Sequence, residues 1–318
     1  MIEVKDLVKK YGSHLAVDHL SFTLESGKIY GFLGPNGAGK STTMNIMTGY
    51  LGATQGSVLI DGHDILKEPE EAKKHIGYLP ELPPLYMDMT VQEYLEFAAE
   101  LKKLPKEKRE SDISEVMKLT RLQDVSDRLI KNLSKGYKQR VGLAQAILGF
   151  PEIIILDEPT VGLDPKQIIE IRELIRTLSK KHTVILSSHI LAEVREVCDY
   201  ILIISKGKLV ASDTPENLEL LRNGASSLEL EVKAAPETAR AILSIIDDID
   251  AMEMHSENEN LTRVKLETKN GADIREAIFY AFAEEKCPLL EMKTAKASLE
   301  DIFMELTQKE ESNDAGNL

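Results

Sequence analysis

The sequence contains only two cysteines, Cys198 and Cys287, which are far apart and belong to no CxxC motif. We therefore expect two reduced thiols and predict no metal site at the cysteines. No stretch approaches the roughly 20 apolar residues that a transmembrane helix needs. The most apolar runs, 153–156 and 200–204, have the length of buried strands. The N-terminus also lacks the apolar core of a secretory signal, so we expect a chain that does not itself span a membrane.

Positive charge is also scarce, because 39 lysines and arginines face 53 acidic residues and the net charge is −14. This balance disfavours a broad nucleic-acid-binding surface, and we predict no nucleic-acid partner. Hydrophobic residues make up 42% of the 318 residues, which suits a folded protein with a sizeable core. The length allows one large domain and a smaller one.

Residues 1–221 alternate short apolar strands with helical stretches and hold most of the glycine-rich loops. This alternation predicts an α/β domain with a largely parallel sheet. The early apolar segments 2–5, 16–24 and 57–60 predict an antiparallel β flank. A stretch rich in Lys, Glu and Leu, 82–135, predicts a helical insert with helices over 91–103 and 111–120.

Residues 222–309 predict a second, smaller domain, which begins with a polar linker over 222–227. The alternation of strand and helix patterns that follows has the order β-α-β-β-α-β, which predicts a ferredoxin-like α+β domain. A last helix is expected to begin at Ser298, a favourable N-cap with Asp301 three residues on. The polar tail 310–318 is expected to be disordered.

The strongest motif is Gly34–Ser41, a full match to G-x-x-x-x-G-K-[ST]. An apolar strand over 29–33 precedes it and a helical stretch over 42–47 follows. In such a loop, glycines let backbone N–H groups turn toward phosphates, and the helix adds its positive N-terminal end. Lys40 would reach the β- and γ-phosphates, and Ser41 would hold Mg²⁺. The predicted nucleotide-binding residues of this segment are Asn36, Gly37, Ala38, Gly39, Lys40, Ser41 and Thr42.

Two carboxylates follow the apolar strand 153–156. Asp157 ends that strand, which is the place of the second Mg²⁺-holding element in P-loop enzymes. Glu158 comes next and could orient an attacking water or accept its proton, so we predict a catalytic role for it. P-loop kinases, small GTPases and motor ATPases share these elements, so they leave the class open.

Leu133–Arg140 (LSKGYKQR) stands shortly before that strand, and here the sequence resembles the ATP-binding subunits of ABC transporters. The resemblance covers roughly residues 1–215 and implies an ATP- and Mg²⁺-dependent ATPase. In that family the signature serine begins a helix whose N-terminus points at the γ-phosphate bound by the other subunit. Ser134 fits this role, since serine is a favoured N-cap and helix N-termini attract anions. Gly136 belongs to the same signature.

The resemblance implies further site residues in the family's order. Tyr11 matches the aromatic residue that stacks on adenine. Asp164 closes the loop 161–164 that crosses the dimer interface, and His189 matches the switch histidine near the γ-phosphate.

The chain departs from the family pattern at three positions. Glu81 stands where the family has a glutamine; its oxygens can still ligate Mg²⁺, although they add negative charge. Lys135 replaces the first glycine of the signature and Tyr137 replaces its glutamine. Because Ser134 and Gly136 remain, γ-phosphate recognition is expected to survive.

The family implies two partners: a second copy of the chain or a homologous ATPase subunit, and separate transmembrane permease subunits. It also implies a location at the cytoplasmic face of the membrane. The C-terminal segment Ser298–Phe303 resembles the appendage of drug, antibiotic and ion exporter ATPases, which favours export. Two alternatives remain at this point. One is a soluble ABC-type ATPase in translation or DNA repair. The other is a nucleotide sensor with little turnover, which the departures at Glu81 and Lys135 would suit.

Overall fold

A computed structural model describes residues 1–220, 227–258, 260–269 and 272–295. The chain forms two compact units, Met1–Thr214 and Pro215–Leu318. None of the helices in the described ranges is long and apolar enough to cross a membrane.

The larger unit is built on a six-stranded sheet in the order β10-β9-β3-β8-β7-β6. Every neighbouring pair is parallel except β9 with β10, which confirms the predicted α/β class. The strands β3, β7 and β8 are buried at every position, as parallel strands covered on both faces require. The bounds are β3 Ile29–Leu33, β6 Ile76–Leu79, β7 Ile153–Leu156, β8 Thr183–Ser188, β9 Tyr200–Ser205 and β10 Lys208–Asp213.

The predicted antiparallel flank is confirmed as a second sheet in the order β2-β1-β4-β5. Its strands are longer than the apolar segments suggested, because their exposed ends carry polar residues. The bounds are β1 Ile2–Tyr11, β2 His14–Leu24, β4 Gln55–Ile60 and β5 His63–Asp64. Apolar side chains of both sheets, such as Ile2, Leu20, Phe32 and Ile155, share one core.

Helices connect the parallel strands, because the chain must return from the carboxyl end of one strand to the amino end of the next. They are α1 Lys40–Met47, α2 Pro69–Lys74, α5 Lys135–Ile147, α6 Pro165–Ser179 and α7 Leu191–Val197. The carboxyl ends of β3, β7 and β8 therefore open toward the same edge of the sheet, where ligands bind in folds of this kind.

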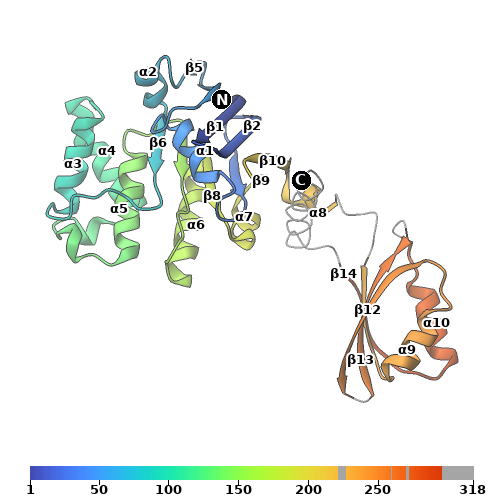
Figure 1. The fold of residues 1–318 in the computed structure, drawn as a ribbon. Coiled ribbons are helices and arrows are strands. Elements are labelled where there is room, and N and C mark those ends of the chain that lie inside the picture. Colours follow the sequence, from blue (N-terminus) through green and yellow to red (C-terminus); the bar gives the residue numbers. More distant parts are fainter. Residues whose placement is uncertain (221–226, 259, 270–271, 296–318) are drawn as a thin grey trace. The chain divides into compact units, whose positions relative to one another are not determined.

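The helical insert contains α3 Val91–Leu101 and α4 Lys106–Leu119, followed by short 3-10 turns η1 Gln123–Val125 and η2 Ile130–Asn132. Helix α3 begins with a capping box between Thr90 and Glu93. Helix α4 begins five residues before the predicted start at 111, because its first turns are charged and exposed and show no apolar periodicity. Figure 1 shows α3, α4 and α5 together at one end of this unit.

Helix α5 packs directly on strand β6. A Cβ at Gly77 would lie 2.1 Å from the carbonyl oxygen of Ala146, and one at Gly142 would lie 2.8 Å from Pro83 and Leu79. Both positions therefore require glycine, because a side chain at either one would prevent the close approach of α5 to β6 and the residues after it.

The smaller unit contains the predicted β-α-β-β-α-β order, in an all-antiparallel sheet β12-β13-β11-β14. This is the ferredoxin-like arrangement. The bounds are α8 Pro215–Leu220, β11 Ser227–Val232, α9 Pro236–Leu243, β12 Ile249–Asn258, β13 Leu261–Thr268, α10 Arg275–Glu284 and β14 Leu289–Ala295. Alternate residues of β11 and β13 pack under α9 and α10 in a core that includes Leu230, Leu266 and Phe282.

Some sequence expectations need correction or fall outside the described ranges. The alternating pattern of the smaller unit predicts a helix over about 236–247, but helix α9 ends at Leu243. The chain turns there through a hydrogen bond from Ile246 N–H to the Leu243 carbonyl. Ser227, expected in the linker, is the first residue of β11. The other linker residues, the helix expected from Ser298 and the tail 310–318 lie outside the described residues.

Candidate functional site

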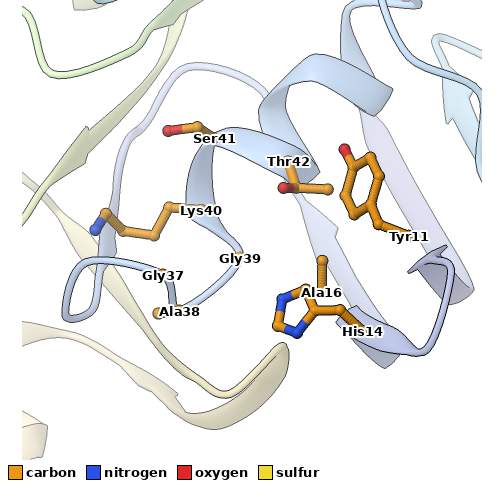
Figure 2. Close-up of a pocket in the computed structure, with 9 residues that line it drawn as sticks. All are labelled: Tyr11, His14, Ala16, Gly37, Ala38, Gly39, Lys40, Ser41 and Thr42. Carbon is orange, nitrogen blue, oxygen red and sulfur yellow. The ribbon is translucent and has the colours of Figure 1, made fainter.

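The phosphate-binding loop joins β3 to α1, as the motif predicts. Gly37 and Gly39 have φ values of 82° and 102°, which residues with a Cβ rarely adopt. A Cβ at Gly39 would also lie 2.5 Å from the carbonyl oxygen of Ala16, so the loop packs against β2. In Figure 2 the loop passes from Gly37 to Ser41 and continues into α1. Asn36 is exposed in the turn.

Lys40 is only 6% exposed, and its ammonium is held at the loop. Nζ donates to the carbonyl oxygens of Gly34 at 2.7 Å and Pro35 at 3.2 Å. Burial lowers the pKa of Lys40, and the nearby carboxylates of Glu158, Asp157 and Glu81 oppose that shift. The lysine thus lies among three acidic groups that come from two strand ends.

Ser41, Glu81 and Asp157, the three predicted Mg²⁺ ligands, line one cavity of about 830 Å³. The Ser41 hydroxyl donates a hydrogen bond to Oδ1 of Asp157 at 3.2 Å, so these two predicted ligands lie next to each other. Glu81 follows β6, which pairs with β7 just before Asp157. A hydroxyl and carboxylates are the hard oxygen donors that Mg²⁺ prefers, so these residues fit the ion.

Glu158 lies at the centre of the predicted catalytic group. It is 8% exposed, and its φ of 48° places a non-glycine residue in the left-handed region. Nδ1 of His189 lies 3.0 Å from its Oε2, and Nζ of Lys40 lies 3.9 Å from its Oε1. The fold thus brings together Lys40, Glu158 and His189, which are separated by up to 149 residues (189 − 40) in the sequence.

Beside the loop lies a second cavity of about 210 Å³. Tyr11 at the end of β1 and His14 and Ala16 on β2 line it together with Gly37–Thr42 (Figure 2). The Tyr11 ring is 48% exposed, and Lys9 Nζ lies 5.2 Å from its centroid. An exposed aromatic face next to the phosphate loop is free to stack on a base. His14 and Ala16 were not predicted; their place on the hairpin after Tyr11 is what brings them here.

Ser134, Gly136 and Asp164 line neither of these two cavities. Ser134 is the N-cap of α5 and accepts a hydrogen bond from Tyr137 N–H at 3.4 Å, as predicted for a capping serine. Asp164 caps α6 in the same way through Gln167 N–H at 3.0 Å. Both caps are exposed, whereas Gly136 is buried. Within one chain these residues are separate from the phosphate loop.

The site also contains buried polar residues that sequence reasoning missed. Ser187 donates to Oδ1 of Asp157 at 2.6 Å and accepts from Glu158 N–H at 2.8 Å. Gln139 of α5 donates to the carbonyl oxygen of Pro159 at 3.2 Å. Ser187 could have been found from its position at the polar end of an apolar strand, where Ser188 and His189 follow it directly. Gln139 carries no such signal, because it lies inside a helix.

Comparison with known proteins identifies the family. Residues 17–161 match the family model for ABC transporters. The chain is 36% identical over 310 residues to the uncharacterized ABC transporter ATP-binding protein YhcH of Bacillus subtilis, covering 96% of both chains. It is 34% identical to the bacitracin transport ATP-binding protein BcrA of Bacillus licheniformis, covering 96% of this chain and 97% of that protein.

Solved structures agree with this result. The ATP-binding subunit of an ABC transporter superposes with a TM-score of 0.64 at 32% identity, covering 70% of this chain and 92% of the other. A dimeric ATP-binding cassette bound to ADP and Pi in a post-hydrolysis state gives a TM-score of 0.62 at 26% identity, covering 67% and 98%. These relatives favour transport over translation or DNA repair. The chain is an ATP-hydrolysing member of the ATP-binding subunits of ABC transporters, a family whose cassettes dimerise and work with transmembrane subunits.

Proposed function

We propose that two copies of this chain, or this chain and a homologue, form a head-to-tail dimer with two composite ATP sites. The observation that carries the proposal is the convergence of Lys40, Asp157, Glu158 and His189 at one sheet edge, while the exposed caps Ser134 and Asp164 lie elsewhere on the same unit. A second chain can supply those caps to complete the site. Helix N-termini carry about half a positive charge, which suits the γ-phosphate.

In this proposal Tyr11 stacks on adenine, and the loop from Asn36 to Thr42 holds the phosphates. Ser41, Asp157 and Glu81 would hold Mg²⁺, which neutralises phosphate charge. Glu158 orients the attacking water and accepts its proton, and His189 holds the Glu158 carboxylate and reaches the γ-phosphate. Such an arrangement performs hydrolysis by positioning and electrostatics, with no covalent enzyme intermediate.

The transmembrane subunits are proposed to dock at the cavity that Ser41, Glu81 and Asp157 share. Its rim exposes Tyr50 at 82% and Leu82 at 78%, which suits an apolar partner segment. A segment seated there would contact both the helical insert and the Mg²⁺ ligands. Nucleotide-driven movement could then reach the membrane subunits, which would hold the chain at the cytoplasmic face. The similarity to the bacitracin transport protein supports export as the direction.

Complementation between two inactive variants tests the composite site. Ser134→Arg should inactivate a homodimer, because a long cation displaces the capping hydroxyl, and Lys40→Ala should inactivate it through the phosphate loop. A mixed dimer has one site with both lesions and one with none. Mixing the two proteins should therefore restore part of the ATPase activity when a single intact site suffices.

Subunit exchange is verified separately by fluorescence transfer between labelled copies. If exchange occurs and no activity returns, the head-to-tail site is wrong, because a site built within one chain would carry a lesion in every subunit.

A further inference from the structure

Glu193 on α7 is a buried carboxylate that the ATPase mechanism above does not use. It is 7% exposed, and its Oε2 accepts two hydroxyl hydrogen bonds, from Thr160 at 2.6 Å and from Ser188 at 3.2 Å. In the described part of the chain no ion pair joins it to a cation. Keeping an unpaired carboxylate out of water costs free energy unless hydrogen bonds offset it. Its two donors belong to the two segments that form the catalytic edge.

The first donor lies in the segment after β7. Thr160 is two residues beyond Glu158, whose left-handed backbone needs restraint from its surroundings. Three buried side chains supply that restraint: Ser187 binds the Glu158 N–H, Gln139 binds the Pro159 carbonyl, and Glu193 binds the Thr160 hydroxyl. They come from β8, α5 and α7, so three different elements hold a segment of three residues.

The second donor lies in the segment after β8. Ser188 immediately precedes His189, and its hydroxyl also accepts the Ile190 N–H at 3.0 Å. The Ser188 side chain thus closes a tight turn around His189. The Ser188 hydroxyl donates to Glu193, which belongs to α7. Helix α7 therefore holds the turn that positions the His189 imidazole. A single carboxylate oxygen therefore links the side chain of Thr160, two residues after Glu158, to the side chain of Ser188, which directly precedes His189.

We propose that Glu193 is a positioning residue that sets the 3.0 Å approach of His189 to Glu158 by clamping Thr160 and Ser188 together. Its side chain lines neither of the two cavities at the site. The inference rests on the roles proposed for Glu158 and His189. Losing the clamp lets the two segments separate, and misplacing a catalytic group by about 1 Å can cost on the order of 100-fold in rate. The phosphate loop and the Tyr11 pocket are not part of the clamp, so ATP affinity should be preserved.

The test measures kcat, KM for ATP and thermal stability of the dimeric full-length chain. Glu193→Ala should lower kcat about 10- to 100-fold with an unchanged KM. Glu193→Gln keeps an acceptor oxygen of the same reach and should recover most of that loss. Thr160→Val and Ser188→Ala each remove one arm and should give intermediate values. Glu196→Gln, the same change three residues along α7 at a half-exposed position, is the control and should leave kcat unchanged.

Three results would overturn the proposal: an unchanged kcat in Glu193→Ala, a KM that rises with the fall in kcat, or a Glu193→Gln variant as slow as Glu193→Ala at equal melting temperature. If Glu193→Ala also lowers the melting temperature, Thr160→Val and Ser188→Ala decide the question. The proposal requires at least one of these two variants to have a lower kcat while its melting temperature and KM stay at the wild-type values. Glu158→Gln is assayed in parallel. If that variant still turns over normally, it is the proposed catalytic role that fails.

Discussion

Nζ of Lys40 lies 3.9 Å from Oε1 of Glu158, so the phosphate-loop cation and the proposed catalytic carboxylate lie side by side in a buried site. The carboxylate opposes the effect of burial, which lowers the pKa of Lys40. The two residues should nevertheless respond differently to substitution, because we propose that Lys40 binds phosphate and that Glu158 acts on water.

Lys40→Ala removes the buried cation from the phosphate loop, and we expect weaker ATP binding. Loss of a charge-assisted hydrogen bond costs about 1.5–3 kcal/mol, so affinity should fall roughly 10- to 100-fold. Isothermal titration calorimetry measures the affinity, with Lys28→Ala as the control because Lys28 is a partly exposed lysine outside the phosphate loop and is paired with Glu25. An unchanged affinity would contradict the phosphate-loop assignment.

Glu158→Gln keeps the shape of the side chain and removes the carboxylate that we propose accepts a proton from water. ATP affinity should persist while kcat falls about 100-fold or more, and the dimer should accumulate in an ATP-bound, closed form. Phosphate release and size-exclusion chromatography with ATP measure the two effects. Glu173→Gln, at a 60% exposed position on α6, serves as the control. A rate near that of the wild type would show that another group activates the water.

Lys102 makes stability depend on pH. Its ammonium donates to the carbonyl oxygens of Ala146 and Leu148 at the end of α5, and burial lowers its pKa from 10.5 to about 8. Between about pH 8 and 10.5 the unfolded chain therefore binds more protons at this residue than the folded chain, so its contribution to stability rises with pH across that window.

Replacing Lys102 with methionine should remove this pH dependence. Between pH 7.5 and pH 10.5, the unfolding free energy of the wild type should rise relative to that of the variant by up to about 3 kcal/mol, since one pKa unit equals about 1.4 kcal/mol. Urea denaturation at both pH values measures it, with the exposed Lys74→Met as the control. A difference that stays constant with pH would mean that Lys102 has an ordinary pKa.

Removal of residues 225–318 should leave ATP binding intact, because the proposed nucleotide contacts all lie before that point. Calorimetry on the truncated chain measures the affinity, and circular dichroism verifies folding. A folded truncation that no longer binds ATP would assign the smaller unit a role in the site.

Elements with a local signature were predictable from the sequence. The phosphate loop, the strand ending in Asp157 and the ferredoxin-like order each follow from short patterns, in which apolar runs alternate with glycine or polar residues. The restraints around Glu158 were not predictable in this way. Ser187, Gln139 and Glu193 bond Glu158, Pro159 and Thr160 across 29, 20 and 33 residues respectively. These contacts exist only once β7, β8, α5 and α7 are packed. A buried glutamate inside a short helix looks, in sequence, like any surface glutamate.

The close packing of α5 on β6 has a consequence for exchanging parts between related chains. Ordinary contacts to a Cβ exceed 3.0 Å, so any side chain at Gly77 would push the helix away from the sheet. Helix α5 is 13 residues long, about 20 Å, and Ser134 stands at its far end, so such a tilt would be magnified there. A chimera that takes its membrane-subunit preference from another cassette should therefore replace only the segment between β6 and α5, after Pro83 and before Leu133. Strand β6 and helix α5 should be inherited together as one unit.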